Sequence, residues 1–388
     1  MLKLHKLFAE KISHAFGHQL KPTDEQRAHL VSCKNKIRDH LRKGIEAATV
    51  SQLGMDRRVT PRFRTQGSWS YGTCVQPAQH PPQEMDWDFG VYLPVTVWED
   101  NGPPHVMAKL YFQLVEQLLQ GLCAQEKWGL ISGKDTCIRV KIATWAHIDL
   151  PLYAAPESQF VQIVEKALAL TAQGITMDSI DLSESFAGGE LQRQAWEDMD
   201  SIMLATRSGE WKESDPEAVT RWLKDRIAEH DDQLARVWRY LKAWRDFHWK
   251  DGGPSSVCLM IAIAQNFQRQ PGRDDLAIEK AAEHLATALR FEIREAAIDG
   301  RSEDFNRLDP IAREVAAQKA MELQNSIFQA RTWHFGFKSN AISALRQAFG
   351  QRIPDDQNLI EQDTGADAIR NTDASQVKRP VVVATQAG

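Results

Sequence analysis

Two aspartates, Asp86 and Asp88, lie two residues apart inside the largely apolar run QEMDWDFGVYLP. Successive side chains on a strand point to opposite faces, so this run predicts a strand on which both carboxylates share one face, about 6–7 Å apart. Trp87 points to the other face. Such a pair of carboxylates suits a pair of divalent cations, although exposed acidic pairs on solvated strand faces are also common.

The segment before these aspartates predicts a strand followed by a tight turn. A short alternating run at 62–65 ends in Gln66-Gly67-Ser68, and we expect the turn at Gly67 to lead into a short helix around 69–73. Helix N-termini present unpaired N–H groups and can bind phosphate. The turn therefore predicts backbone and hydroxyl donors for the triphosphate of a nucleotide.

A predicted hairpin supplies a third aspartate. Residues 134–144 alternate between apolar and polar side chains, with Arg139 on the polar face, and predict a half-buried strand. The next run, AHIDLPLY, predicts a second strand on which His147 and Asp149 share a face. If the hairpin lies beside the strand of Asp86, Asp149 joins the first two carboxylates. Arg139 would then either pair with these carboxylates or contact a ligand.

The joint pattern of a Gly-Ser turn, Asp-x-Asp and a later isolated Asp is more specific than any part alone. Three carboxylates on adjacent strands can hold two Mg²⁺ ions about 3.5–4 Å apart, one activating a hydroxyl and one neutralising a leaving pyrophosphate. The histidines show no metal-ligand spacing, so no histidine metal site is expected. The sequence has no GxxxxGK[ST] motif, which excludes a P-loop as the nucleotide site.

Elsewhere the apolar spacing predicts a succession of helices. The first begins after Thr23, which forms a capping box with Gln26, and runs to about residue 49. Further helices are predicted at 105–127, 215–229, 231–249, 255–268, 276–298, 310–330 and 340–350. The six tryptophans between 196 and 249 are predicted to be core residues rather than platforms for base stacking.

The predicted helix at 231–249 carries three basic residues, Arg239, Lys242 and Arg245, and leads into GGPSS. Basic residues on a helix usually form a solvated face. A cation close to a triphosphate would instead offset its charge, and a capping serine, Ser255 or Ser256, can bond a phosphate or ribose oxygen.

Composition places these motifs in a soluble cytoplasmic protein. A chain of 388 residues, 43% of them hydrophobic, is expected to form two subdomains. The net charge of −5 gives no global attraction for nucleic acid or anionic membrane, so polyphosphate must bind in a local basic pocket. The five scattered cysteines indicate a reducing compartment. Neither a signal peptide nor a membrane-spanning run is expected.

Several segments of the chain together resemble the cGAS/DncV-like nucleotidyltransferase family, in particular its bacterial cyclic GMP-AMP synthases. In order along the chain they are TPRFRTQGSWSYGT, QEMDWDFGVYLP, TCIRVKI with AHIDLPLYAAP, SGEWKESDP, KAWRDFHW and GGPSS. The resemblance covers about residues 55–260. It implies an α+β fold, with a DNA-polymerase-β-like core of mixed sheet and helices packed against a mostly helical C-terminal domain. The organisation expected is a core with a long N-terminal helix at 1–170, a polar connecting segment at 171–213, a helical domain at 214–352 and a disordered tail at 353–388.

The resemblance also implies roles for individual residues. Asp86, Asp88 and Asp149 match the catalytic triad that binds two Mg²⁺ ions, which Mn²⁺ can replace. The positions expected to contact the two nucleotides are Gln66, Gly67, Ser68, Tyr71, Arg139, Ser214, Lys242, Ser255 and Ser256. Asp304 matches a base-reading acidic position, in a region that aligns poorly.

The implied activity is a Mg²⁺-dependent cyclic dinucleotide synthase that joins ATP and GTP to 3′,3′-cyclic GMP-AMP and releases pyrophosphate. A ribose hydroxyl of one nucleotide attacks the α-phosphorus of the other, with Asp149 as metal ligand and proton acceptor. Three alternatives stay open: a synthase of another cyclic di- or trinucleotide, a linear nucleotidyltransferase acting on RNA, protein or a small molecule, and a catalytically silent binding module.

The resemblance further implies partners. The family acts in bacterial antiphage systems, in which the cyclic product is a second messenger for an effector protein. Some of these systems carry ubiquitin-like conjugation enzymes that attach the synthase through its C-terminus, which makes Gly388 a candidate for conjugation. Neither a membrane nor bound nucleic acid is expected to be required.

Overall fold

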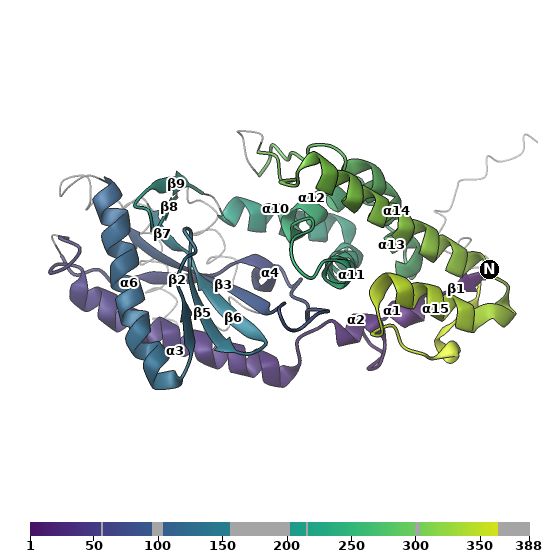
Figure 1. Ribbon diagram of the computed structural model, residues 1–388, viewed down its shortest axis with the longest axis horizontal. Coiled ribbons are helices and arrows are strands. Elements are labelled where there is room, and N and C mark those ends of the chain that lie inside the picture. The colour runs from purple at the N-terminus through teal and green to yellow at the C-terminus, as the bar shows by residue number, and fades with distance from the viewer. Residues whose placement is uncertain (56, 95–103, 156–201, 215, 299–302, 364–388) are drawn as a thin grey trace, which may run out of the picture.

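The computed structural model describes residues 1–388 except 56, 95–103, 156–201, 215, 299–302 and 364–388. The described part has a mixed sheet with helices at one end and a helical region at the other (Figure 1). This arrangement confirms the predicted α+β class.

The sheet is organised around β3 (Met85–Pro94), the strand that carries Asp86 and Asp88. The described strands follow the order β4-β5-β6-β3-β7-β8-β9, and β2 also pairs with β3. Both β6 and β7 run parallel to β3, whereas β5 is antiparallel to β6, which confirms the predicted hairpin. The bounds of the other strands are β2 (Arg62–Thr65), β4 (Gly129–Ile131), β5 (Ile138–Ala143), β6 (Ala146–Leu150), β7 (Leu152–Ala155), β8 (Met203–Ala205) and β9 (Trp211–Glu213).

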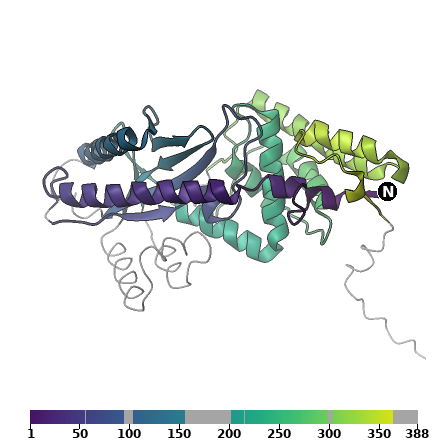
Figure 2. The same cartoon turned by 90° about the horizontal axis from the view of Figure 1, so that it is seen from below.

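Two long helices, α3 (Asp24–Ala48) and α6 (Pro104–Glu126), share an apolar core with one face of the sheet. Helix α3 begins at the predicted capping box, with both Thr23–Gln26 hydrogen bonds present, and it runs along the sheet in Figure 2. Trp87 and Ile148 belong to this core. Because strand side chains alternate, the neighbouring Asp86 and Asp88 point to the opposite face.

The helical region contains six helices that match predicted ones. The predicted helix at 276–298 ends earlier than expected, at Ala288, because the side chain of Asn306 binds the carbonyl oxygens of Leu289 and Phe291 and holds the chain in a loop. No helix in the described residues combines the length and apolar character needed to cross a bilayer. The six are α10 (Pro216–His230), α11 (Asp232–His248), α12 (Ser256–Gln265), α13 (Asp274–Ala288), α14 (Pro310–Thr332) and α15 (Lys338–Phe349).

The first twenty residues pack with this helical region rather than with the sheet, contrary to the expected boundaries. They form β1 (Leu2–Lys3), α1 (His5–Phe8) and α2 (Phe16–Gln19), and their apolar side chains join the helical core. These elements are too short to give a helical period in the sequence. In Figure 1 the N-terminus accordingly lies among the C-terminal helices.

Two further boundaries differ from expectation. Residues 203–213, expected in a connecting segment, add β8 and β9 to the sheet. Residues 353–363, expected in a disordered tail, form η2 (Gln357–Leu359) and β10 (Glu361–Gln362), and β10 pairs with β1. The rest of the connecting segment to 201, and the tail from 364, lie outside the described residues.

Candidate active site

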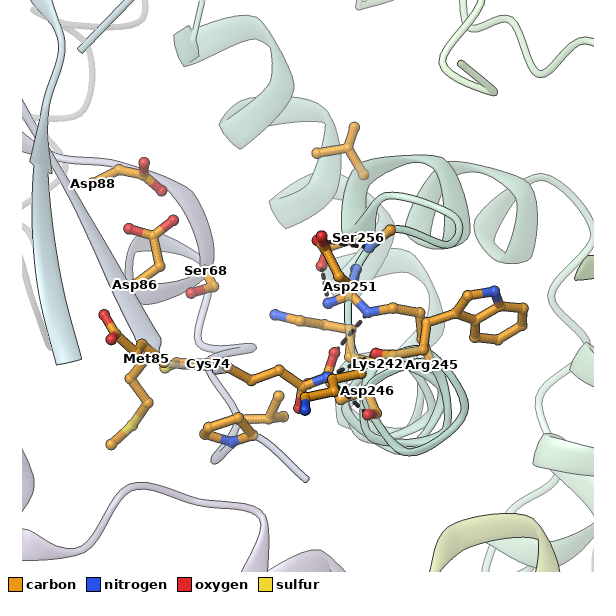
Figure 3. Close-up of a pocket in the computed structure, with 18 of the residues that line it drawn as sticks. Ser68, Cys74, Met85, Asp86, Asp88, Lys242, Arg245, Asp246, Asp251 and Ser256 are labelled. Atoms are coloured by element: carbon orange, nitrogen blue, oxygen red, sulfur yellow. Dashed lines mark hydrogen bonds and ion pairs between the residues drawn. The ribbon is translucent and has the colours of Figure 1, made fainter. Parts of the chain in front are cut away.

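A cavity of about 410 Å³ lies between the sheet and the helical region. Asp86 and Asp88 of β3 line one side, and Lys242 of α11 and Ser256 of α12 line the other, as Figure 3 shows. The walls include six of the predicted site residues: Ser68, Tyr71, Asp86, Asp88, Lys242 and Ser256.

The pairing of β3 with β6 brings the third aspartate to the first two. In the parallel register, Asp86 lies opposite His147 and Asp88 lies opposite Asp149. Asp86, His147 and Asp149 each offer a ligand atom, and these atoms lie within 4.8 Å of one another. The predicted meeting of Asp-x-Asp with the later Asp is therefore present in the structure.

Asp149 is held by two cations. Arg139 donates from Nε and Nη2 over 2.6 and 2.7 Å, and Lys134 donates from Nζ over 2.9 Å. Burial opposes ionisation of Asp149, but these hydrogen bonds and charges outweigh it and lower the pKa of the carboxyl group. Of the two alternatives for Arg139, this structure contains the ion pair with a carboxylate.

Asp88 has the opposite environment. Its burial, followed by the negative charges of Asp86 and Asp149, raises the pKa of its carboxyl group to about 7. The backbone of Gly67 approaches it closely, with φ at +61°, and a Cβ at this position would lie 2.0 Å from Oδ2 of Asp88. Glycine is therefore required at 67 both by the backbone conformation and by the space that Asp88 occupies.

Helix α4 (Gly67–Ser70) follows β2 directly and begins two residues before the predicted short helix. The chain after it is tied to α11 by two buried cations. Arg239 donates to the carbonyl oxygen of Gly72 and Lys242 to that of Thr73, each over 2.7 Å. The side chains of Arg239 and Lys242 are therefore not a solvated face. Burial lowers the pKa of Lys242 to about 8.

Arg245 connects α11 to the start of α12. It donates to Asp246 over 2.6 Å, to the carbonyl oxygen of Pro254 over 3.1 Å and to Oγ of Ser256 over 3.2 Å. Ser255 caps α12 as predicted, accepting from the backbone N–H of Cys258. Arg245 thus orients the Ser256 hydroxyl at the cavity wall.

Several other predicted residues lie away from the cavity lining. Gln66 is buried and contacts the hydroxyl groups of Tyr92 and Tyr153. Ser214 follows β9 and donates its backbone N–H to Ile202. Contacts of these residues with nucleotide stay predictions.

Asp304 has a structural role in the loop after α13. Its carboxylate accepts from the backbone N–H groups of Ile293 and Asn306 and pairs with Arg313 over 2.6 Å. The structure therefore gives no support to a base-reading role for Asp304.

Sequence reasoning placed His147 on the carboxylate face but gave it no role, and it passed over Glu84. His147 is 5% exposed, its Nδ1 lies 2.9 Å from Oε2 of Glu84, and its Nε2 lies 3.1 Å from Oδ1 of Asp86. Lys141 donates to the other oxygen of Glu84 over 2.5 Å. The alternation in AHIDL was the signal available, because it places His147 and Asp149 on one face.

The donor set fits a divalent cation. Oδ1 of Asp86 is buried and has no hydrogen-bond partner among the described residues, although carboxylate oxygens are rarely left in that state. Carboxylate oxygens are the ligands that Mg²⁺ and Mn²⁺ prefer in proteins. Asp86 and Asp149, with Asp88 beside them, are the residues that would hold such an ion.

Two family models match the chain. Residues 61–153 match the nucleotidyltransferase domain of DncV-like cyclic GMP-AMP synthases, and residues 231–362 match the C-terminal domain of cyclic GMP-AMP synthase. The first match contains the three aspartates, and the second contains Lys242 and Ser256.

Curated relatives agree with the family models. A cyclic GMP-AMP synthase of Vibrio cholerae is 32% identical over 313 residues, which cover 78% of this chain and 70% of that protein. A cyclic GMP-AMP synthase of Escherichia coli is 40% identical over 214 residues, covering 54% of this chain and 48% of that protein. The second match thus spans about half the length of the relative.

Solved structures extend the likeness to 93% of the chain. The crystal structure of Vibrio cholerae DncV cyclic AMP-GMP synthase superposes with a TM-score of 0.73 at 26% identity, covering 93% of this chain and 99% of that one. A second structure, of the same enzyme with the linear intermediate 5′-pppA(3′,5′)pG, gives the same TM-score and identity. This chain therefore belongs to the DncV-like nucleotidyltransferases, the enzyme family of the bacterial cyclic GMP-AMP synthases.

Proposed function

We propose that this protein is a Mg²⁺-dependent cyclic dinucleotide synthase that converts ATP and GTP into 3′,3′-cyclic GMP-AMP and pyrophosphate. One observation carries the proposal: Asp86 and Asp88 meet Asp149 beside a cavity whose opposite wall presents Lys242 and Ser256. That arrangement occurs in a chain whose relatives are cyclic GMP-AMP synthases.

The residues of the two cavity walls have different roles in this proposal. Asp86, Asp88 and Asp149 would hold the divalent cation, which when bound would activate the attacking hydroxyl and offset the charge of the leaving pyrophosphate. Lys242 and Ser256 bind phosphate or ribose oxygens from the helical side, and Arg245 keeps the Ser256 hydroxyl in place. Ser68 and Tyr71 contact nucleotide from the side of the sheet.

The reaction uses the same chemistry twice. A ribose 3′-hydroxyl oxygen of one nucleotide forms a bond to the α-phosphorus of the other, the bond from that phosphorus to the oxygen bridging the α- and β-phosphates breaks, pyrophosphate leaves with the bridging oxygen, and the hydroxyl proton passes to solvent. A second such step within the linear product closes the ring. The Vibrio enzyme with 5′-pppA(3′,5′)pG bound supports a first step in which the adenosine hydroxyl attacks GTP.

The test is incubation of the purified protein with each pair of nucleoside triphosphates and Mg²⁺, followed by phosphatase treatment and mass spectrometry. We expect a phosphatase-resistant product with the mass of cyclic GMP-AMP from ATP plus GTP. A product of another base composition would correct the choice of bases. A product that is entirely phosphatase-sensitive would instead support a linear nucleotidyltransferase.

Variants test the assignment of the carboxylates. The double variant Asp86→Asn with Asp88→Asn should make no cyclic product, whereas Asp225→Asn, which alters an exposed carboxylate on α10, should retain wild-type activity. Product from the double variant would refute the metal assignment.

The proposal extends to the biological setting. We place the enzyme in the bacterial cytoplasm, where its product would act as a second messenger for an effector protein in antiphage defence. Conjugation through Gly388 is a further proposal, and this residue lies outside the described part of the chain. Production of the cyclic nucleotide during phage infection of cells that carry the gene would test the defence role.

A further inference from the structure

A histidine nitrogen lies beside the proposed metal-binding carboxylates and forms an ion pair with one of them, Asp86. Nε2 of His147 and Oδ1 of Asp86 are both buried and lie 3.1 Å apart, and neither has a hydrogen bond of good geometry to any described residue. They are close enough to interact but are not aligned as donor and acceptor. Two buried polar atoms left in this state require an explanation, and both can bind a cation.

We propose that His147 is a direct ligand of the divalent cation, through Nε2, beside Asp86 and Asp149. The inference rests on the proposed function in one respect, namely that a catalytic cation binds at these carboxylates. It adds a nitrogen to a ligand set that the sequence indicated to be made of oxygens alone.

The distances fit neighbouring positions around one ion. In octahedral coordination with bonds of about 2.1 Å, two adjacent ligands lie about 3.0 Å apart. The observed separation of His147 Nε2 and Asp86 Oδ1 is 3.1 Å. A carboxylate oxygen of Asp149 completes a group whose members all lie within 4.8 Å of one another. Trans ligands of such an ion lie about 4.2 Å apart, so one ion contacts all three side chains after a small inward shift of the Asp149 carboxylate, which Arg139 and Lys134 hold in this structure.

The surroundings of His147 orient the ring for this role. Its Nδ1 lies 2.9 Å from Oε2 of Glu84, and Glu84 is anchored in turn by Lys141 over 2.5 Å. When Nδ1–H donates to a carboxylate, the lone pair of Nε2 is directed at the metal, an arrangement typical of metal-binding histidines. Glu84 is accordingly a positioning residue that acts through His147.

A nitrogen ligand alters metal preference. Oxygen ligands suit Mg²⁺ and Mn²⁺, whereas imidazole favours transition metals over Mg²⁺. We therefore expect wild-type protein to bind Mn²⁺ more tightly than Mg²⁺, and His147→Gln to lose at least tenfold in Mn²⁺ affinity with a smaller loss for Mg²⁺. Glu84→Gln should lose about tenfold in Mn²⁺ affinity, the usual effect of changing a group that orients a ligand.

A direct bond from nitrogen to the metal can be detected without measuring activity. Electron spin-echo envelope modulation of the Mn²⁺-loaded full-length protein should show ¹⁴N coupling from one imidazole. The coupling should be absent in His147→Gln, and it should persist in His14→Gln, which changes a histidine about half exposed on the surface. Labelling the wild-type protein with ¹⁵N-histidine should replace the ¹⁴N coupling by a ¹⁵N coupling. This measurement keeps the test valid if His147→Gln does not fold.

The outcomes separate this inference from the proposed function. Wild-type protein that makes cyclic product but shows no ¹⁴N coupling, or coupling that persists in His147→Gln, would overturn direct ligation. His147 would then only pair electrostatically with Asp86. Histidine coupling in a protein that makes no cyclic product would support the ligand and refute the activity.

Discussion

Replacement of Gly67 by alanine is expected to abolish most synthase activity in a protein that still folds. Gly67 has φ at +61°, and a Cβ built there would lie 2.0 Å from Oδ2 of Asp88. The clash falls on the end of one side chain rather than on backbone, so Asp88 can move away. It would do so by leaving its place beside Asp86 and Asp149.

The size of both effects follows from the geometry. Non-bonded heavy atoms in contact are about 3.5 Å apart, so Oδ2 must shift by more than about 1 Å. A misplacement of about 1 Å in a catalytic site can lower the rate by about 100-fold. The left-handed backbone costs a non-glycine residue about 1–2 kcal/mol, which a folded domain with a stability of about 5–15 kcal/mol tolerates.

A second glycine provides a matched control. Gly72 also has positive φ, at +70°, but a Cβ there would have no atom within 4 Å. Gly72→Ala should therefore carry the same backbone cost and retain most of its activity. The assay is the initial rate of cyclic product at saturating nucleotide, with urea unfolding of each variant. Equal loss of activity in both variants, or near wild-type rates in Gly67→Ala, would refute the role assigned to the contact with Asp88.

Two further predictions concern buried ion pairs. Glu217 of α10 is 2% exposed and accepts two hydrogen bonds, of 2.7 and 2.6 Å, from Arg64 of β2. The variant Glu217→Ala should lower the free energy of unfolding in urea by about 3–5 kcal/mol, because it leaves the Arg64 charge buried and unpaired. The double variant Arg64→Met with Glu217→Leu should recover most of that loss. Burial opposes ionisation of Asp274, but its hydrogen bonds and ion pair with Arg236 outweigh burial and lower the pKa of Asp274 in the folded protein. The ionised Asp274 therefore stabilises the fold fully above the pKa of about 3.9 in the unfolded chain, and this contribution is lost as the pH falls through the lower pKa of the folded protein. Asp274→Asn should therefore be less stable at pH 7, with a flatter dependence of urea unfolding on pH below about 4; an unchanged acid profile would contradict this.

The sequence predicted most of the core of the site because the necessary signals are local. The alternation around Asp86 and Asp149 defines two strands, and the short connection at Thr144-Trp145 makes the second strand part of a hairpin. The capping box at Thr23 defines the start of α3. Each of these signals spans only a few residues, so none depends on the distant parts of the chain.

The features that were missed depend on contacts between distant segments. Leu2 pairs with Gln362, near the other end of the described residues, and no local sequence pattern predicts that pairing. The burial of Arg239 and Lys242 likewise depends on carbonyl oxygens of the segment after α4 rather than on their own helix. A basic face on an isolated helix is expected to be exposed to solvent. Arg239 and Lys242 are buried only because α11 packs against the segment after α4.

The position of His147 shows how pairing turns two weak sequence patterns into one site. Asp-x-Asp on β3 and His-x-Asp on β6 have the same spacing, and the parallel register aligns Asp86 with His147 and Asp88 with Asp149. Because side chains alternate with a period of two, a shift of one residue in this register would turn the two polar side chains of the shifted strand away from those of its neighbour. Trp87 and Ile148 lie between them in the core formed with α3 and prevent that shift, since either strand would otherwise direct polar groups into that core. The apolar residues between the proposed metal ligands therefore fix the register that brings those ligands together.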